Sequence, residues 1–158
     1  TPASSLTIFL GKFILFILFG FLEMMYTLFL AIFLYDLRIT GSIYATIVIL
    51  FLLSCAAISI GLFISSRIKS MQQALVMIPL IIIPSFLISN SFFPPEVMPD
   101  FMLYVSKITP MTFSNHALNS IMIKGFSLHE ILPDIYVLIA FTLIPLILFI
   151  WSYRRMKY

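Results

Sequence analysis

The chain has 158 residues, of which 62% are hydrophobic and only 9% are charged, and its mean hydropathy is +1.16. A soluble domain carries about 25% charged residues, so the composition excludes a water-covered globule and predicts an all-α integral membrane protein. The formal net charge of +3 does not indicate a nucleic-acid partner, and the single cysteine, Cys55, excludes an intrachain disulfide.

Four apolar segments are long enough to be transmembrane helices, because about 20 residues cover a hydrocarbon core of roughly 30 Å. Their expected bounds are 13–35, 42–64, 74–91 and 135–153. Small residues at 54–61 suit close helix packing. Pro79 and Pro84 predict a kink in the third segment. Ser127 and Glu130 have capping-box spacing and predict the start of the fourth helix.

The distribution of charge predicts the topology. With four spans, both ends lie on one side, together with the basic residues Lys12, Arg67, Lys69, Arg154, Arg155 and Lys157. The other side holds Arg38, Lys107 and Lys124, and five of the six acidic residues. Basic residues favour the cytoplasmic side. We therefore expect a multi-pass protein of the plasma (inner) membrane with both ends of this segment in the cytoplasm.

A turn rich in aromatic residues and proline interrupts the chain after the third span. Consecutive prolines cannot continue a helix, since each lacks a backbone donor and clashes with the preceding turn. We expect this turn to lie at the outer lipid–water boundary; in a transporter it would contribute to an outer gate. The candidate residues are Asn90, Phe92, Phe93, Pro94, Glu96, Pro99 and Pro110.

Two short amphipathic helices are predicted between this turn and the last span, at 99–108 and 111–123. Each is about half the length that a transmembrane helix needs. They could lie flat on the outer surface. Alternatively, they could form a re-entrant pair that dips part way into the membrane, where protein covers the broken backbone.

Glu23 is the one acidic residue near the middle of a predicted span. An ionisable group at this depth is costly, and it usually faces a pathway or a polar partner. The alternative is a protonated side chain that is hydrogen-bonded to Ser54 or Ser59 of the second span. His116 and His129 are the only histidines, too few at this spacing to predict a metal site.

Five short motifs occur in order along the chain. They are Thr1-Pro2 with Leu10-Gly11-Lys12, the loop 65–74, Phe92-Phe93-Pro94 with Met98-Pro99, Ile108-Thr109-Pro110-Met111-Thr112, and Lys124-Gly125. Together they resemble the motifs of a permease subunit of the ABC-2 type, the membrane half of an ATP-binding-cassette exporter. The stretch before Phe92, 89–91, departs from the family, which usually has a glycine there.

This resemblance implies that the chain is a single transmembrane domain, 1–158, corresponding to the third to sixth spans of a six-span permease whose beginning is missing here. It also implies re-entrant outer helices and pairing with a second permease copy or homologue. A cytoplasmic ATP-binding-cassette ATPase would bind ATP and Mg, so this chain would need no cofactor of its own. The face coupled to that ATPase would comprise Thr1, Pro2, Arg67 and Lys69.

Three hypotheses for function therefore stand. A transport permease would use Glu23 in its pathway or its packing, and its sparsely charged spans favour an amphipathic or lipid-like substrate. A membrane-embedded enzyme would depend on His116 or His129. A structural membrane anchor would tolerate a changed charge at Glu23 and helix-breaking substitutions at 101–123.

Overall fold

The computed structural model describes residues 5–89, 91, 93 and 97–155, and its secondary structure in these residues is entirely helical. The order of the helices is α1 (Ser5–Tyr35), α2 (Ile43–Ser65), α3 (Met71–Ile88), α4 (Asp100–Ser106), α5 (Pro110–Met122) and α6 (Leu132–Arg155). The predicted all-α class is thereby confirmed.

Four of these helices have the length and apolar composition needed to cross a membrane, as the sequence predicted. These spans are Gly11–Tyr35, Ile43–Ser65, Met71–Ile88 and Leu132–Trp151. Helices α3 and α6 each begin three residues before their expected starts at 74 and 135. Helix α3 is continuous through Pro79 and Pro84.

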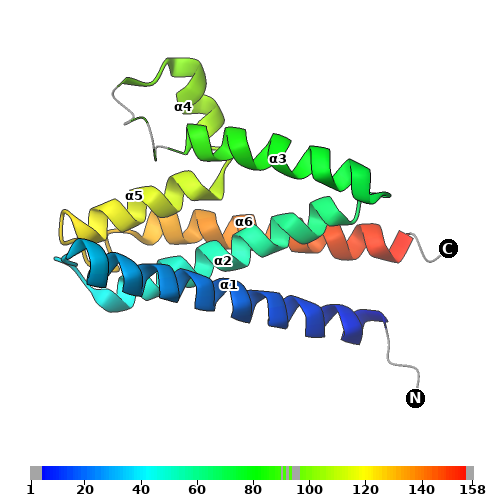
Figure 1. The fold of residues 1–158 in the computed structure, drawn as a ribbon, viewed down its shortest axis with the longest axis horizontal. Helices are drawn as coiled ribbons and strands as arrows, with labels where there is room; N and C mark the ends of the chain where they lie inside the picture. The colour runs from blue at the N-terminus through cyan, green and yellow to red at the C-terminus, as the bar shows by residue number, and fades with distance from the viewer. Residues whose placement is uncertain (1–4, 90, 92, 94–96, 156–158) are drawn as a thin grey trace.

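The helix bundle has two distinct ends (Figure 1). At one, called the α1–α2 end, α1 finishes, α2 begins, α5 finishes and α6 begins. At the other, the α2–α3 end, α2 turns into α3, and α1 begins and α6 finishes. Helix α2 is central, because it packs against α1, α5 and α6.

The buried core is concentrated at the α1–α2 end. Its members come from the first turns of α2, the second half of α5, and the start of α6 with the residue before it. They are Ala45, Ile49, Ala117, Ile121, Ile131, Ile135 and Leu138. Removing such side chains from water is the main source of packing stability. In contrast, α3 has no buried residue, and its main contacts are with α4 and α5.

Serine caps define the starts of α2 and α3. The Ser42 hydroxyl accepts a hydrogen bond from the Ala45 amide (3.4 Å), and the Ser70 hydroxyl accepts one from the Gln73 amide (3.2 Å). Each bond satisfies a backbone donor that has no partner within its helix. The α2–α3 connection is therefore a short, defined turn.

The predicted capping box before α6 forms a separate turn instead. A Glu130 side-chain oxygen accepts hydrogen bonds from the Ser127 amide (2.7 Å) and hydroxyl (3.1 Å). The α-helix nevertheless begins only at Leu132. The prediction of a helix start at Ser127 is wrong, because the carboxylate closes a turn at 127–130 that comes before the first residue of α6.

Candidate functional site

Helix α5 lies alongside the spanning helices rather than across their ends (Figure 1). It packs against α2 and α6. Its Phe113 ring lies 6.1 Å from that of Phe141, which is nine residues into α6. Pro110 occupies the first turn, where its missing amide costs no helical hydrogen bond. The packing of α5 along α2 and α6 is compatible with the re-entrant alternative.

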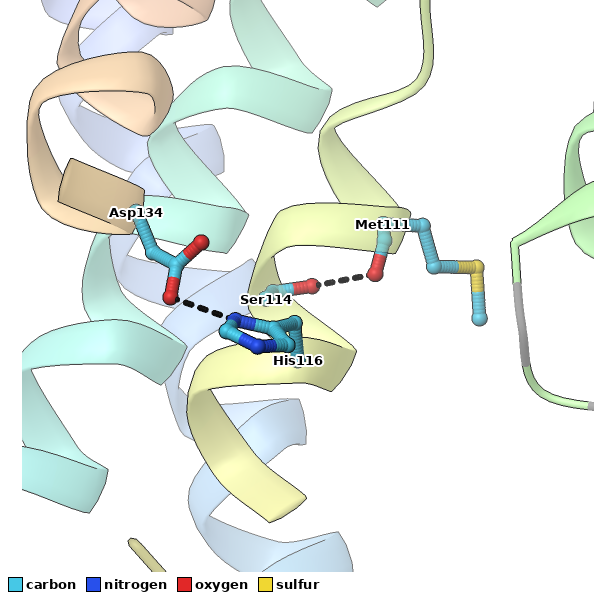
Figure 2. A network of polar contacts seen from close by, with 4 residues as sticks. All are labelled: Met111, Ser114, His116 and Asp134. Atoms are coloured by element: carbon cyan, nitrogen blue, oxygen red, sulfur yellow. Dashed lines mark hydrogen bonds and ion pairs between the residues drawn. The ribbon is translucent and has the colours of Figure 1, made fainter. Parts of the chain in front are cut away.

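The faces of α5 differ from those expected for a helix on a membrane surface. An amphipathic helix on a surface would expose its serines, but Ser114 and Ser120 are buried. The Ser114 hydroxyl donates to the Met111 carbonyl at 3.0 Å, as Figure 2 shows. Small hydroxyl side chains that bond within their own helix allow close packing in a bundle. Burial of this face therefore follows from packing against α2 and α6.

A histidine–aspartate pair joins α5 to the start of α6 (Figure 2). The distance between His116 Nδ1 and Asp134 Oδ2 is 2.8 Å. The side chain of Asp134 is only 11% exposed, whereas that of His116 is 63% exposed. Asp134 also lies in the first turn of α6, where the helix dipole favours a negative charge. The pair therefore links the exposed side of α5 to α6 through a buried carboxylate.

Asn115 joins the other side of α5 to the end of α3. Its side-chain amide donates to the Ser89 carbonyl at 2.9 Å and to the Ser91 hydroxyl at 2.6 Å. Ser89 is fully buried, so its carbonyl has little access to other donors. Because α3 has no buried residue of its own, these two bonds help to hold its C-terminal end by attaching the residues that immediately follow its last turn.

We expect Asn115→Leu to release the end of α3. The substitution leaves a buried carbonyl without its donor, which costs about 1–3 kcal/mol. Hydrogen exchange of the last turn of α3 should become faster, while exchange in α2 stays unchanged. The matched control is Asn119→Leu, one turn later on the exposed side of α5. Equal exchange in the two variants would contradict the anchoring role.

The connection between α1 and α2 is attached to the end of α5. The Thr40 hydroxyl donates to the Met122 carbonyl at 2.6 Å, and the Thr40 amide donates to the same oxygen at 3.3 Å. Gly41 lies so close that a methyl group added there would be 2.5 Å from the Ile121 carbonyl oxygen. Glycine at this position allows the two backbones to meet.

A cavity of about 680 Å³ lies between α2 and α3. Met24 of α1 and the α4–α5 junction at Thr109 and Pro110 complete its lining. None of the described residues that line it is charged, and most are aliphatic. Its volume falls within the range of small-molecule sites, about 300–1,000 Å³. The cavity can therefore hold an apolar molecule, but its described lining has no charged side chain to pair with a charged ligand.

The turn at the α2–α3 end carries the predicted coupling residues Arg67 and Lys69. Both are exposed. The Arg67 guanidinium lies over the Phe63 ring at 5.4 Å, and the Lys69 amide donates to the Gln73 side chain at 3.0 Å. The turn thus presents two positive charges on an ordered backbone. Thr1 and Pro2, assigned to the same face, lie outside the described residues.

Glu23 lies on an exposed face of α1 and is not joined to Ser54 or Ser59. Those hydroxyls donate to carbonyls of their own helix, Ser54 to Phe51 (2.7 Å) and Ser59 to Cys55 (2.8 Å). In the described part of the chain the Glu23 carboxylate has no hydrogen-bond partner. The alternative in which Glu23 is hydrogen-bonded to Ser54 or Ser59 is therefore not the arrangement found, because both hydroxyls donate within α2.

The predicted outer turn is described only in part. Pro99 is the N-cap residue of α4, and its carbonyl accepts a bond from the Met102 amide at 2.8 Å. Phe93 is half exposed. The other residues assigned to this turn, Asn90, Phe92, Pro94 and Glu96, lie outside the described residues.

Sequence reasoning did not identify the residues that hold α5 in place. Thr40, Asn115 and Asp134 are common polar residues whose roles depend on partners far along the chain. The one available signal was Asp134 at the start of an apolar span, where an acid suits the helix dipole.

Together, four apolar helices, a broken helical pair packed beside them and an uncharged cavity define a multi-pass membrane protein. The model of the ABC-2 type transporter family matches residues 1–123. The chain therefore belongs to the ABC-2 type transporter family.

Two named relatives agree with this assignment. The chain is similar to the linearmycin resistance permease protein LnrN of Bacillus subtilis, with 27% identity over 66% of this chain and 27% of the relative. It is also similar to ABC transporter G family member 20 of Dictyostelium discoideum, with 26% identity over 65% of this chain and 14% of the relative. The chain thus spans about a quarter or less of these relatives. No solved structure matches it.

Proposed function

We propose that this chain forms part of the translocation path of an ABC-2 type exporter, which moves a solute or lipid using ATP hydrolysed by a partner subunit. The observation that carries the proposal is the family match over residues 1–123, which includes α1 to α5. The uncharged cavity between α2 and α3 supports an amphipathic or lipid-like substrate. The Bacillus relative is named as a resistance permease, which supports outward transport.

The proposed partners follow from this role. A cytoplasmic ATP-binding-cassette ATPase would bind ATP and Mg and dock on the α2–α3 turn, with Thr1 and Pro2 nearby. A second permease copy would pair with this one in the plasma (inner) membrane. The exposed apolar surface of α1 around Glu23 supports packing of that helix against another span or copy. Helices α4 and α5 would line or gate the exit.

The coupling role of the α2–α3 turn predicts the effect of charge reversal. In the full-length protein with its ATPase, Arg67→Glu/Lys69→Glu should lower substrate-stimulated ATP hydrolysis severalfold, because the acidic turn no longer complements its docking surface. Membrane insertion should be unchanged. The matched control, Lys107→Glu/Lys124→Glu, reverses two charges predicted to lie on the other side. Unchanged stimulation in the first variant would argue against coupling through this turn.

The proposed topology predicts which side of the membrane exposes each end. In a Cys55→Ala background, Ser70→Cys should react with an impermeant thiol reagent only from the cytoplasm, and Asp100→Cys only from outside. Leu80→Cys, midway along α3 and exposed in the bundle, should react from neither side because lipid excludes the reagent. The reverse pattern of labelling would contradict the orientation.

A further inference from the structure

We infer that the cavity between α2 and α3 binds an acyl chain of an anionic phospholipid taken from the membrane leaflet at the α2–α3 end. The inference goes beyond the proposed function, because a lipid could occupy this site whether or not the protein transports it. It depends on three properties of the cavity: its length, its uniformly apolar lining and the charges beside its end.

The length of the cavity matches that of a lipid chain. Its lining extends on α2 from Leu53 to Ser65 and on α3 from Ala74 to Phe86. Each stretch is about 18 Å long at 1.5 Å per residue. A bilayer core of roughly 30 Å gives each leaflet a hydrocarbon depth of about 15 Å. A chain entering from one leaflet would therefore lie along most of the cavity.

The chemistry of the lining suits a hydrocarbon. Of the three hydroxyl side chains along it, two already donate to backbone carbonyls: Ser85 to Ile81 (2.6 Å) and Thr109 to Ser106 (3.0 Å). Aliphatic groups make up most of the remaining lining. A polar ligand would lose hydration here without gaining partners, which is unfavourable. An acyl chain has no such cost.

The end of the cavity determines the class of headgroup. Ser65, the last residue of α2, and Ile68 of the α2–α3 turn line the cavity, and the exposed Arg67 and Lys69 are the two neighbours of Ile68 in sequence. Glu23 is next in sequence to the lining Met24, but it does not itself line the cavity. Basic residues at a membrane surface attract anionic lipids by about 1 kcal/mol each. The site therefore favours a negatively charged headgroup over a zwitterionic one.

The loose attachment of α3 explains how a lipid could enter. None of its side chains is buried, and among the hydrogen bonds described for its C-terminal end, Asn115 donates only to Ser89 and Ser91, which follow its last turn. At its other end, α3 follows α2 through the short turn 66–70. A chain could enter laterally between two helices that do not pack tightly on each other.

The test is photolabelling of the full-length protein in phosphatidylcholine vesicles. The probe is phosphatidylglycerol, or phosphatidylcholine for comparison, with a diazirine at the end of one acyl chain. Labelled peptides are mapped by mass spectrometry. We expect labels on the cavity-lining stretches of α2 and α3, with preference for the anionic probe.

Two sets of variants make the result decisive. Gly61→Phe places a ring in the cavity and should reduce this labelling severalfold. Gly11→Phe is the matched control, since neither glycine has an atom within 4 Å of an added methyl group. Arg67→Gln/Lys69→Gln should reduce the preference for the anionic probe by about five-fold per residue, the equivalent of about 1 kcal/mol each.

Equal labelling of Gly61→Phe and Gly11→Phe would overturn the proposal. So would unlabelled α2 and α3 stretches in the wild type, the result expected if another protein helix fills the cavity. Equal labelling by the two probes would overturn the assignment to an anionic lipid. None of these results involves ATP hydrolysis, so the transport proposal stands or falls separately.

Discussion

Gly41→Ala should destabilise the protein strongly, by about 3 kcal/mol or more. The added methyl group would lie 2.5 Å from the Ile121 carbonyl oxygen and 3.1 Å from that of Phe126. Both are backbone atoms, one in the last turn of α5 and the other in the connection that follows it, and they cannot rotate away as a side chain could. Overpacking of a tight contact typically costs about 1–3 kcal/mol, and occasionally more. Thermal unfolding of the full-length protein in detergent would measure the effect.

A second glycine provides the control for this prediction. Gly61 lies inside α2, and no atom is within 4 Å of an added methyl group. Alanine is favoured over glycine in a helix by about 0.5–1 kcal/mol, so Gly61→Ala should be slightly stabilising. The two substitutions should therefore act in opposite directions. Equal melting temperatures for the two variants would contradict the close approach of Gly41 to α5.

His116→Ala should cost about 2 kcal/mol of stability, because it leaves the Asp134 carboxylate buried without its donor. An unsatisfied buried acceptor costs about 1–3 kcal/mol, and more if it is charged. Adding Asp134→Ala removes that penalty. The double variant should therefore be more stable than the sum of the two single effects predicts, which a double-mutant cycle would show.

The same variants separate the hypotheses for function. If His116 only positions α5, transport per folded molecule should change little in His116→Ala. If His116 were catalytic, His116→Ala would instead abolish activity and leave the melting temperature unchanged. Strictly additive effects of the two substitutions on stability would contradict the pairing of His116 with Asp134.

The spans could be predicted because their signals are local. A run of apolar residues as long as the bilayer is thick identifies a spanning helix without knowledge of its neighbours. Ser42 and Ser70, next to apolar runs, are similarly local signals for helix starts. The prediction of a helix start at Ser127 was wrong, because the hydrogen bond between the Ser127 amide and the Glu130 carboxylate also forms in a turn that precedes a helix.

The arrangement of α5 could not be predicted, because its attachments join residues far apart in the chain. Thr40 bonds to a carbonyl 82 residues away, and Asn115 bonds to one 26 residues away. Nothing in the composition of α5 distinguishes the buried Ser114 from the exposed Asn119. Likewise, Glu23 has polar residues on the neighbouring helix, but the hydroxyls of Ser54 and Ser59 donate within α2.

The most direct test of the transport proposal is purification of the full-length protein in mild detergent, followed by an ATPase assay of the proteins that accompany it. The proposal predicts that an ATP-binding-cassette ATPase co-purifies and that its substrate-stimulated activity requires this chain. If no ATPase activity accompanies the intact, folded protein, the proposal that this chain is the permease of an ATP-driven exporter is contradicted.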